Sequence, residues 1–125
     1  MNPFGHIDLR VRDIDAAVLF YDQLLPELGF ARRFFSEEWK TYATTDPLPS
    51  TAFFALTEDR EHRPNANRIA FWVGSREEVE RLAGVAGQAG ASLSGPKHMP
   101  YSPGYYGVFF ADPSGNALEI YYRPD

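Results

Sequence analysis

The sequence predicts an α+β fold built from two βαβββ modules, and three observations support this prediction. A strand-like alternation followed by a helical pattern and a glycine occurs twice, over residues 6–29 and 68–90. The two segments are of nearly equal length, and each is followed by about three more strand-like runs. Residues 108–122 read as two β-rich runs joined by Asp-Pro-Ser-Gly, which is typical of a hairpin with a type I turn.

The first module is expected over about residues 1–57. Residues 6–11 alternate between apolar and polar side chains, which predicts a half-buried strand. Asp13 can cap the helix that follows, and its apolar residues recur at helical spacing until Gly29. Three further strands are predicted over 30–39, 40–45 and 51–57.

The second module is expected over about residues 68–125, after a polar linker at 58–67 that has no periodicity. Residues 68–73 alternate as the first strand does, and the Ser-Arg-Glu-Glu that follows is the pattern of a capping box. The helix that begins there is predicted to end at Gly90. Residues 96–104 are rich in proline and glycine, and we interpret them as a loop.

Strand alternation assigns side chains to two faces in each module. We expect one face to lie under the helix and form the core, with Ile7, Leu9, Val11, Ile69, Phe71, Val73, Leu118 and Ile120. The opposite face is then free to line a site, and it carries His6, Asp8, Arg10, Arg68, Trp72, Glu119 and Tyr121. Glu119 is a lone carboxylate in an aromatic-rich segment, which is costly to bury unless it is paired, binds a metal or does chemistry.

Composition narrows the classes of function. The chain has 125 residues, the size of one domain, and a net charge of −5 without a run of Lys or Arg, which argues against a nucleic-acid partner. There is no cysteine, so a metal would be held by His and carboxylates. The start does not resemble a signal peptide and no apolar run is long enough for a membrane span, so we expect a cytoplasmic protein without a membrane partner.

Three segments together resemble the vicinal oxygen chelate (VOC) superfamily, which includes glyoxalase I, extradiol dioxygenases, and fosfomycin and bleomycin resistance proteins. They are GHIDLRVRDIDAAVLFYDQLLPELGF, RIAFWV with its capped helix, and YYGVFFADPSGNALEIYY. The resemblance implies that the two modules form an open, barrel-like mixed sheet around a cavity. It also implies a small-molecule ligand and a homodimer.

The resemblance further implies a divalent metal such as Zn, Mn, Ni or Fe, bound by residues at set strand positions. His6 and Glu119 match the first and last ligand positions. The other positions depart from the family pattern, because Arg68 stands where a second His is expected and Ala55 where glyoxalase I has a Glu. A guanidinium has no acceptor and stays charged, so Arg68 cannot bind a cation and would repel one.

The sequence leaves several functions open. The chain is either a glyoxalase- or dioxygenase-like lyase, isomerase or oxygenase, with His6 and Glu119 as catalytic residues, or a metal-free binder like the bleomycin resistance proteins. A third alternative is a dimeric interaction module with a vestigial cavity. The resemblance also implies that Arg68 and Glu119 lie within contact distance, and in the structural alternative Glu119 simply pairs with Arg68. The candidate ligand-binding residues are Arg68, Trp72, Tyr121, Phe53, His98 and Tyr101, although aromatic side chains often only pack and the loop residues often only face solvent.

Overall fold

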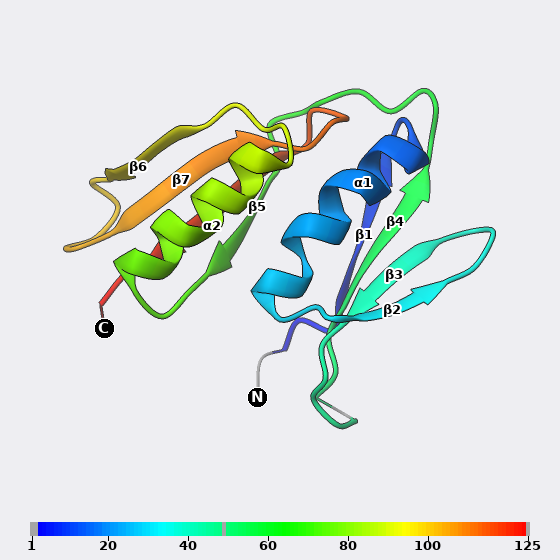
Figure 1. Cartoon of the computed structure of the whole chain (residues 1–125), viewed down its shortest axis with the longest axis horizontal. Coiled ribbons are helices and arrows are strands. Elements are labelled where there is room, and N and C mark those ends of the chain that lie inside the picture. Colours follow the sequence, from blue (N-terminus) through cyan, green and yellow to red (C-terminus); the bar gives the residue numbers. More distant parts are fainter. Residues whose placement is uncertain (1–2, 49, 125) are drawn as a thin grey trace. The chain divides into compact units, whose positions relative to one another are not determined.

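The computed structural model describes residues 3–48 and 50–124, and the chain divides into two compact units between Arg63 and Pro64. Each unit contains one α-helix and one four-stranded mixed sheet (Figure 1). The predicted α+β class and the two βαβββ modules are therefore confirmed. Among the described residues, no helix has the length and apolar character that crossing a membrane requires.

The first unit contains β1 (His6–Val11), α1 (Ile14–Leu24), the short 3₁₀ helix η1 (Pro26–Leu28), β2 (Arg32–Phe35), β3 (Lys40–Ala43) and β4 (Phe53–Glu58). Its strands are ordered β1-β4-β3-β2. Strand β1 pairs in parallel with β4, and the other pairs are antiparallel.

The second unit repeats this topology with β5 (Arg68–Trp72), α2 (Arg76–Gln88), β6 (Ser94–His98), β7 (Tyr106–Ala111) and β8 (Ala117–Tyr122). Its strands are ordered β5-β8-β7-β6, and β5 pairs in parallel with β8. Position by position, β5 therefore corresponds to β1, and β8 corresponds to β4. This correspondence places Arg68 where the first unit has His6, and Glu119 where it has Ala55.

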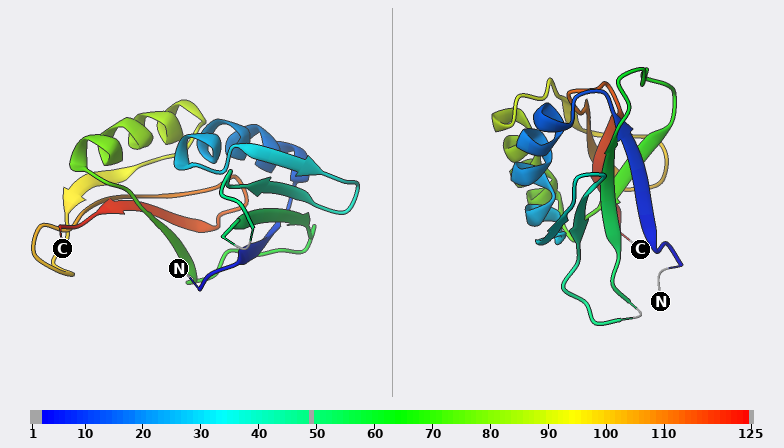
Figure 2. Two further views of the ribbon diagram at one scale, coloured as in Figure 1. Left: turned by 90° about the horizontal axis from the view of Figure 1, so that it is seen from below. Right: turned by 90° about the vertical axis from the view of Figure 1, so that its right-hand side faces the viewer.

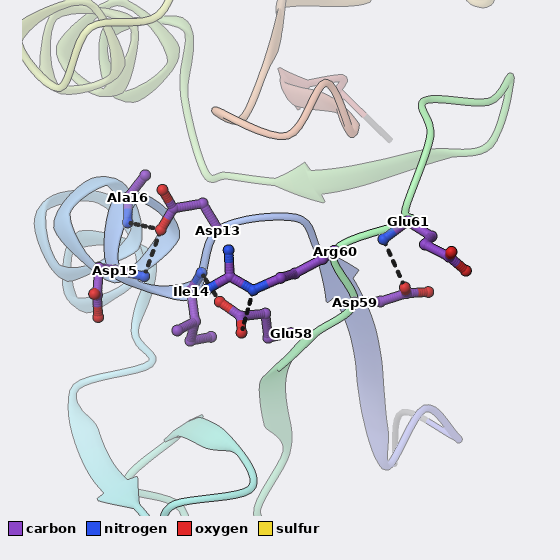
Figure 3. A network of polar contacts seen from close by, with 8 residues as sticks. All are labelled: Asp13, Ile14, Asp15, Ala16, Glu58, Asp59, Arg60 and Glu61. Atoms are coloured by element: carbon purple, nitrogen blue, oxygen red, sulfur yellow. Dashed lines mark hydrogen bonds and ion pairs between the residues drawn. The ribbon is translucent and has the colours of Figure 1, made fainter.

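The start of α1 is fixed by two carboxylates, one from the cap residue Asp13 and one from Glu58 of β4 (Figure 3). Asp13 accepts hydrogen bonds from the backbone N–H groups of Asp15 and Ala16, as expected for a helix cap. Glu58, at the end of β4, accepts a third hydrogen bond from the N–H of Ile14 at 3.0 Å. The helix is thereby tied to the sheet that it covers.

The predicted capping box at the start of α2 is only half formed. The hydroxyl of Ser75 accepts a hydrogen bond from the N–H of Glu78 at 3.1 Å. The reciprocal bond is replaced, because the Glu78 carboxylate instead accepts two hydrogen bonds from Arg81 one turn along the helix. This Arg–Glu pair is bidentate and charge-assisted, which is why it competes well with a bond to one backbone N–H.

The predicted hairpin of residues 108–122 is confirmed, with β7 and β8 antiparallel. Asp112 organises the turn, because its carboxylate accepts hydrogen bonds from the N–H of Ser114 at 2.8 Å and of Asn116 at 3.0 Å. Gly115 has φ +84°, a conformation that glycine adopts without strain. The turn fixes the register that brings Phe109 opposite Glu119.

Among the strands, most fully buried side chains lie on the central strands β3, β4, β7 and β8 rather than on the first strand of each unit. Leu118 and Ile120 of β8 and Phe54 and Leu56 of β4 are completely buried. The expected core residues Ile7, Leu9, Ile69, Phe71 and Val73 are only half-buried, whereas Val11 is fully buried. The reason is topological, since β1 and β5 are edge strands of their four-stranded sheets. Each helix covers one face of its own sheet (Figure 2).

The interpretation of residues 96–104 as one loop was wrong at its start, because strand β6 extends to His98. Pro96 is tolerated in this strand because β6 lies at the sheet edge, where a missing N–H leaves no ladder bond broken. The pairing with β7 is irregular between Ser94 and Lys97.

Candidate functional site

One face of the second sheet is turned away from α2, and we call it the open face. Side chains of Val108, Leu118 and Ile120 are buried on the opposite face, where the Tyr106 hydroxyl also reaches Glu80 of α2 at 3.1 Å. By strand alternation and register, the open face carries Arg68, Ala70 and Trp72 of β5, Ala117, Glu119 and Tyr121 of β8, and Gly107, Phe109 and Ala111 of β7.

Glu119 lies at the centre of the open face and is only 4% exposed. Its Oε2 atom accepts a hydrogen bond from the hydroxyl of Tyr105. Its Oε1 atom lies 3.9 Å from Nη1 of Arg68, so the expected proximity of these two residues is confirmed. That distance is too long for a hydrogen bond, and the Arg68 side chain is half-exposed, so the pair is a weak ion pair.

Aromatic rings surround this carboxylate. The ring of Tyr105 stacks on Tyr121 with centroids 4.7 Å apart, and Tyr101 meets Tyr105 edge-on at 5.0 Å. Burial, followed by the hydrogen bond to Glu119, raises the pKa of Tyr105 well above its ordinary value. The phenol therefore remains protonated at neutral pH and acts as the donor to Glu119.

Phe109 lies beside Glu119 on β7 and is approached by two cations. The guanidinium carbon of Arg68 lies 5.0 Å from the ring centroid, and the ammonium of Lys97 lies 5.8 Å from it. Because Arg68 and Lys97 stand on opposite edge strands of the sheet, they approach the ring from two sides. The open face therefore carries two positively charged side chains, Arg68 and Lys97, and one buried carboxylate, Glu119.

Gly107 makes room for the carboxylate. A Cβ atom at this position would lie 3.4 Å from Oε2 of Glu119 and 3.3 Å from both the Cβ of Tyr121 and the carbonyl oxygen of Ile120. These separations are tighter than most real Cβ contacts. A side chain here would therefore compete with Glu119 for the space beside Tyr105.

Other candidate residues of the second unit are placed differently. Trp72 lies on the open face and is 72% exposed, and Tyr101 joins the aromatic cluster through Tyr105. His98 does not join Glu119, because it pairs with Tyr106 and its ring lies 5.0 Å from that tyrosine, on the α2 side. The reason is the strand β6, since alternation turns Lys97 toward the open face and His98 away from it.

The remaining candidates, His6 and Phe53, are neighbours in the first unit, where β1 pairs with β4. His6 is exposed and Phe53 is half-buried. The nearby Asp8 accepts hydrogen bonds from Arg10 at 3.0 Å and Thr57 at 3.1 Å. The convergence of His6 with Glu119 involves both units and stays a prediction.

Sequence reasoning missed Tyr105, Phe109 and Gly107 as parts of the site. Phe109 could have been found, because hairpin register places it directly across from Glu119. No sequence pattern pointed to Tyr105, because it lies just before β7. The course of the preceding loop brings its hydroxyl to the Glu119 carboxylate.

The side chains around Glu119 do not fit a divalent cation as they lie. One oxygen of the Glu119 carboxylate accepts a hydrogen bond from Tyr105, and the other faces the permanent positive charge of Arg68. Over residues 3–48 and 50–124, no group of three His, Asp or Glu side chains is arranged to hold a metal ion. We therefore derive no chemical step through a metal.

Comparison with known proteins agrees with this architecture. The chain is similar to the uncharacterized protein PA2024 of Pseudomonas aeruginosa, with 28% identity over 121 residues that cover 94% of this chain and 86% of the relative.

Two solved structures share the fold. A glyoxalase/bleomycin resistance protein from Albidiferax ferrireducens has a TM-score of 0.78 at 20% identity, covering 98% of this chain and all of the other. A variant of the fosfomycin resistance protein FosX from Listeria monocytogenes, complexed with Mn(II) and 1S,2S-dihydroxypropylphosphonic acid, has a TM-score of 0.70 at 18% identity. The match covers 96% of this chain and 89% of that one.

The model of the Glyoxalase/Bleomycin resistance protein/Dioxygenase superfamily matches residues 4–120, nearly the whole chain. The resemblance noted in the sequence and the paired modules of the structure point to the same family. The chain belongs to the Glyoxalase/Bleomycin resistance protein/Dioxygenase superfamily.

Proposed function

We propose that the chain binds a small organic molecule on the open face, and that this binding does not require a metal. The observation that carries the proposal is the environment of Glu119, whose two oxygens already meet Tyr105 and Arg68. Beside this filled centre, the exposed indole of Trp72 and the exposed guanidinium of Arg68 are available to a ligand.

The comparisons support the small-molecule part of this proposal. The Listeria FosX variant was solved with a small phosphonic acid and Mn(II). The metal part of that example does not transfer, because Arg68 and Ala55 stand at two of the positions where the family resemblance implies metal ligands. The homodimer and the cytoplasmic location that the resemblance implies remain predictions, and sedimentation analysis tests the first.

Protein-observed NMR with a mixture of neutral and charged aromatic fragments tests the proposal. We expect shifts in the Trp72 indole signal and in the amides of β5 and β8, with and without EDTA. Trp39 provides the internal control, because it is a second exposed indole that belongs to the first unit. Fragment binding only after addition of Mn²⁺ or Zn²⁺ would contradict the proposal, as would the absence of any shift on the open face.

A second candidate function is metal-independent proton transfer of the lyase or isomerase type. The observation that favours it is the hydrogen bond from a buried tyrosine to the buried carboxylate, since such a pair can exchange a proton with a bound molecule. Once a ligand has been identified, its incubation in D₂O tests this function. Deuterium should enter the ligand with the unmodified chain but not with Glu119→Gln, and equal incorporation with both proteins would rule the function out.

A further inference from the structure

We propose that the open face holds a small aromatic carboxylate, with the carboxylate on Arg68 and the ring above Ala70 against Trp72. The inference rests on the proposed function and specifies its ligand class. It starts from the spacing of three residues along the edge strand β5. Arg68, Ala70 and Trp72 alternate onto one face, so a cation and an aromatic ring flank one small side chain.

The spacing sets the size of the ligand. Residues two apart in a strand are separated by about 6.6 Å, so Arg68 and Trp72 are about 13 Å apart along β5. Ala70 and its neighbour Glu119 lie between them, and Ala70 is exposed. A single ring carrying a carboxylate is shorter than this backbone separation, so it fits once the Arg68 and Trp72 side chains have taken up the remainder. Its flat side would then lie over the Ala70 methyl group and its far edge against the indole.

The charges favour an anion at Arg68. Its guanidinium makes no hydrogen bond within residues 3–48 and 50–124, and its distance of 3.9 Å from Glu119 leaves its donors unused. Phe109 holds the guanidinium in place through its ring. The planar donor fork of arginine matches a carboxylate in bidentate fashion. Glu119 does not block this contact, because it is buried and bonded to Tyr105.

Titration calorimetry with benzoate and benzamide tests the inference, since the two probes share a ring and differ in charge. We expect benzoate to bind the unmodified chain at least about tenfold more tightly than benzamide. Arg68→Gln should weaken benzoate binding by about 10- to 100-fold. Lys97→Gln is the matched control, because it removes the same charge from the same face and the same Phe109 ring. It should change the affinity by less than about threefold.

A second pair of variants tests the position of the ring. Ala70→Val adds two methyl groups at the place proposed for the ring and should weaken benzoate binding at least about tenfold. Ala111→Val adds the same side chain at another exposed alanine of the open face and should leave binding unchanged. Valine is favoured in strands, so both variants should fold.

Several outcomes would overturn the inference. Equal affinity for benzoate and benzamide would do so while leaving the proposed function standing. Equal losses in Arg68→Gln and Lys97→Gln would show general charge attraction instead of a built contact. A Trp72 signal that changes with protein concentration, together with a dimer in sedimentation, would show that a second copy covers this face. Absence of binding by either probe and by every fragment would remove both proposals.

Discussion

The hydroxyl of Tyr105 donates a hydrogen bond to Glu119, and this bond joins a loop to the centre of the second sheet. Removing it with Tyr105→Phe leaves a buried carboxylate oxygen without its donor, which should lower the free energy of unfolding by about 1–3 kcal/mol. Urea melts measure the loss. Tyr106→Phe is the control, because that hydroxyl meets the exposed Glu80, and it should cost less than about 1 kcal/mol. Equal losses of unfolding free energy in the two variants would show that the buried hydrogen bond stabilises the fold no more than the exposed one.

The raised pKa of Tyr105 makes stability depend on alkaline pH. Below about pH 10 the phenol is protonated in both the folded and the unfolded chain, so it does not make stability depend on pH. Above that pH the unfolded chain loses the proton while the folded chain keeps it, so the free energy of unfolding falls by up to about 1.4 kcal/mol per pH unit.

Urea melts between about pH 9 and pH 11 test this sign. Tyr42 also has a raised pKa, caused by burial and then by its bond to Asp22, and it adds a similar slope. Tyr105→Phe and Tyr42→Phe should each remove part of the fall in the free energy of unfolding with rising pH. A decline that is unchanged in Tyr105→Phe would contradict the assignment.

The weak geometry of the Arg68–Glu119 pair predicts a small coupling energy. The two groups are 3.9 Å apart and the guanidinium is half-exposed, so solvent screens their attraction. A double-mutant cycle with Arg68→Leu and Glu119→Gln should give a coupling below about 1 kcal/mol. Coupling of several kcal/mol would instead mean that the pair is a principal support of the fold.

The close contacts of Gly107 predict that Gly107→Ala is destabilising. The added methyl group presses on the Ile120 carbonyl and on Glu119, and such overpacking costs about 1–3 kcal/mol. Gly84→Ala is the matched control, because Gly84 lies within α2 with nothing within 4 Å of a new Cβ. It should stabilise the chain by about 0.5–1 kcal/mol. Thermal melts that move both variants in the same direction would contradict this reading.

Strand order decides the cost of core deletions. Ile120 is fully buried on the central strand β8, so Ile120→Ala should lower the free energy of unfolding by about 2–5 kcal/mol. Phe71 is half-buried on the edge strand β5, so Phe71→Ala should fall below the 3–5 kcal/mol typical of a buried phenylalanine. A larger loss for Phe71→Ala than for Ile120→Ala, measured in denaturant, would contradict this order.

Alternation and repeat length were sufficient to predict the modules and the hairpin, whereas the proximity of Arg68 to Glu119 followed from the family resemblance. These patterns were not sufficient to predict how deeply each residue is buried. Alternation shows which face Ile69 and Phe71 occupy, but it does not show that β5 is an edge strand, where they are only half-buried. His98 was assigned to the site because Pro96 suggested a loop, whereas an edge strand accepts proline and turns His98 toward α2. Tyr105 could not be placed at all, since its contact with Glu119 depends on how a loop folds back.

Titration of MnCl₂ and ZnCl₂ into the unmodified, untagged chain tests the central claim most directly, with Arg68→His as the comparison. Because Arg68 and Tyr105 already face the two oxygens of Glu119, the unmodified chain should show no tight stoichiometric heat of binding. If His6 also converges on this centre, Arg68→His should gain affinity for metal. Tight binding of one metal ion by the unmodified chain, lost in Glu119→Gln, would contradict the metal-independent account.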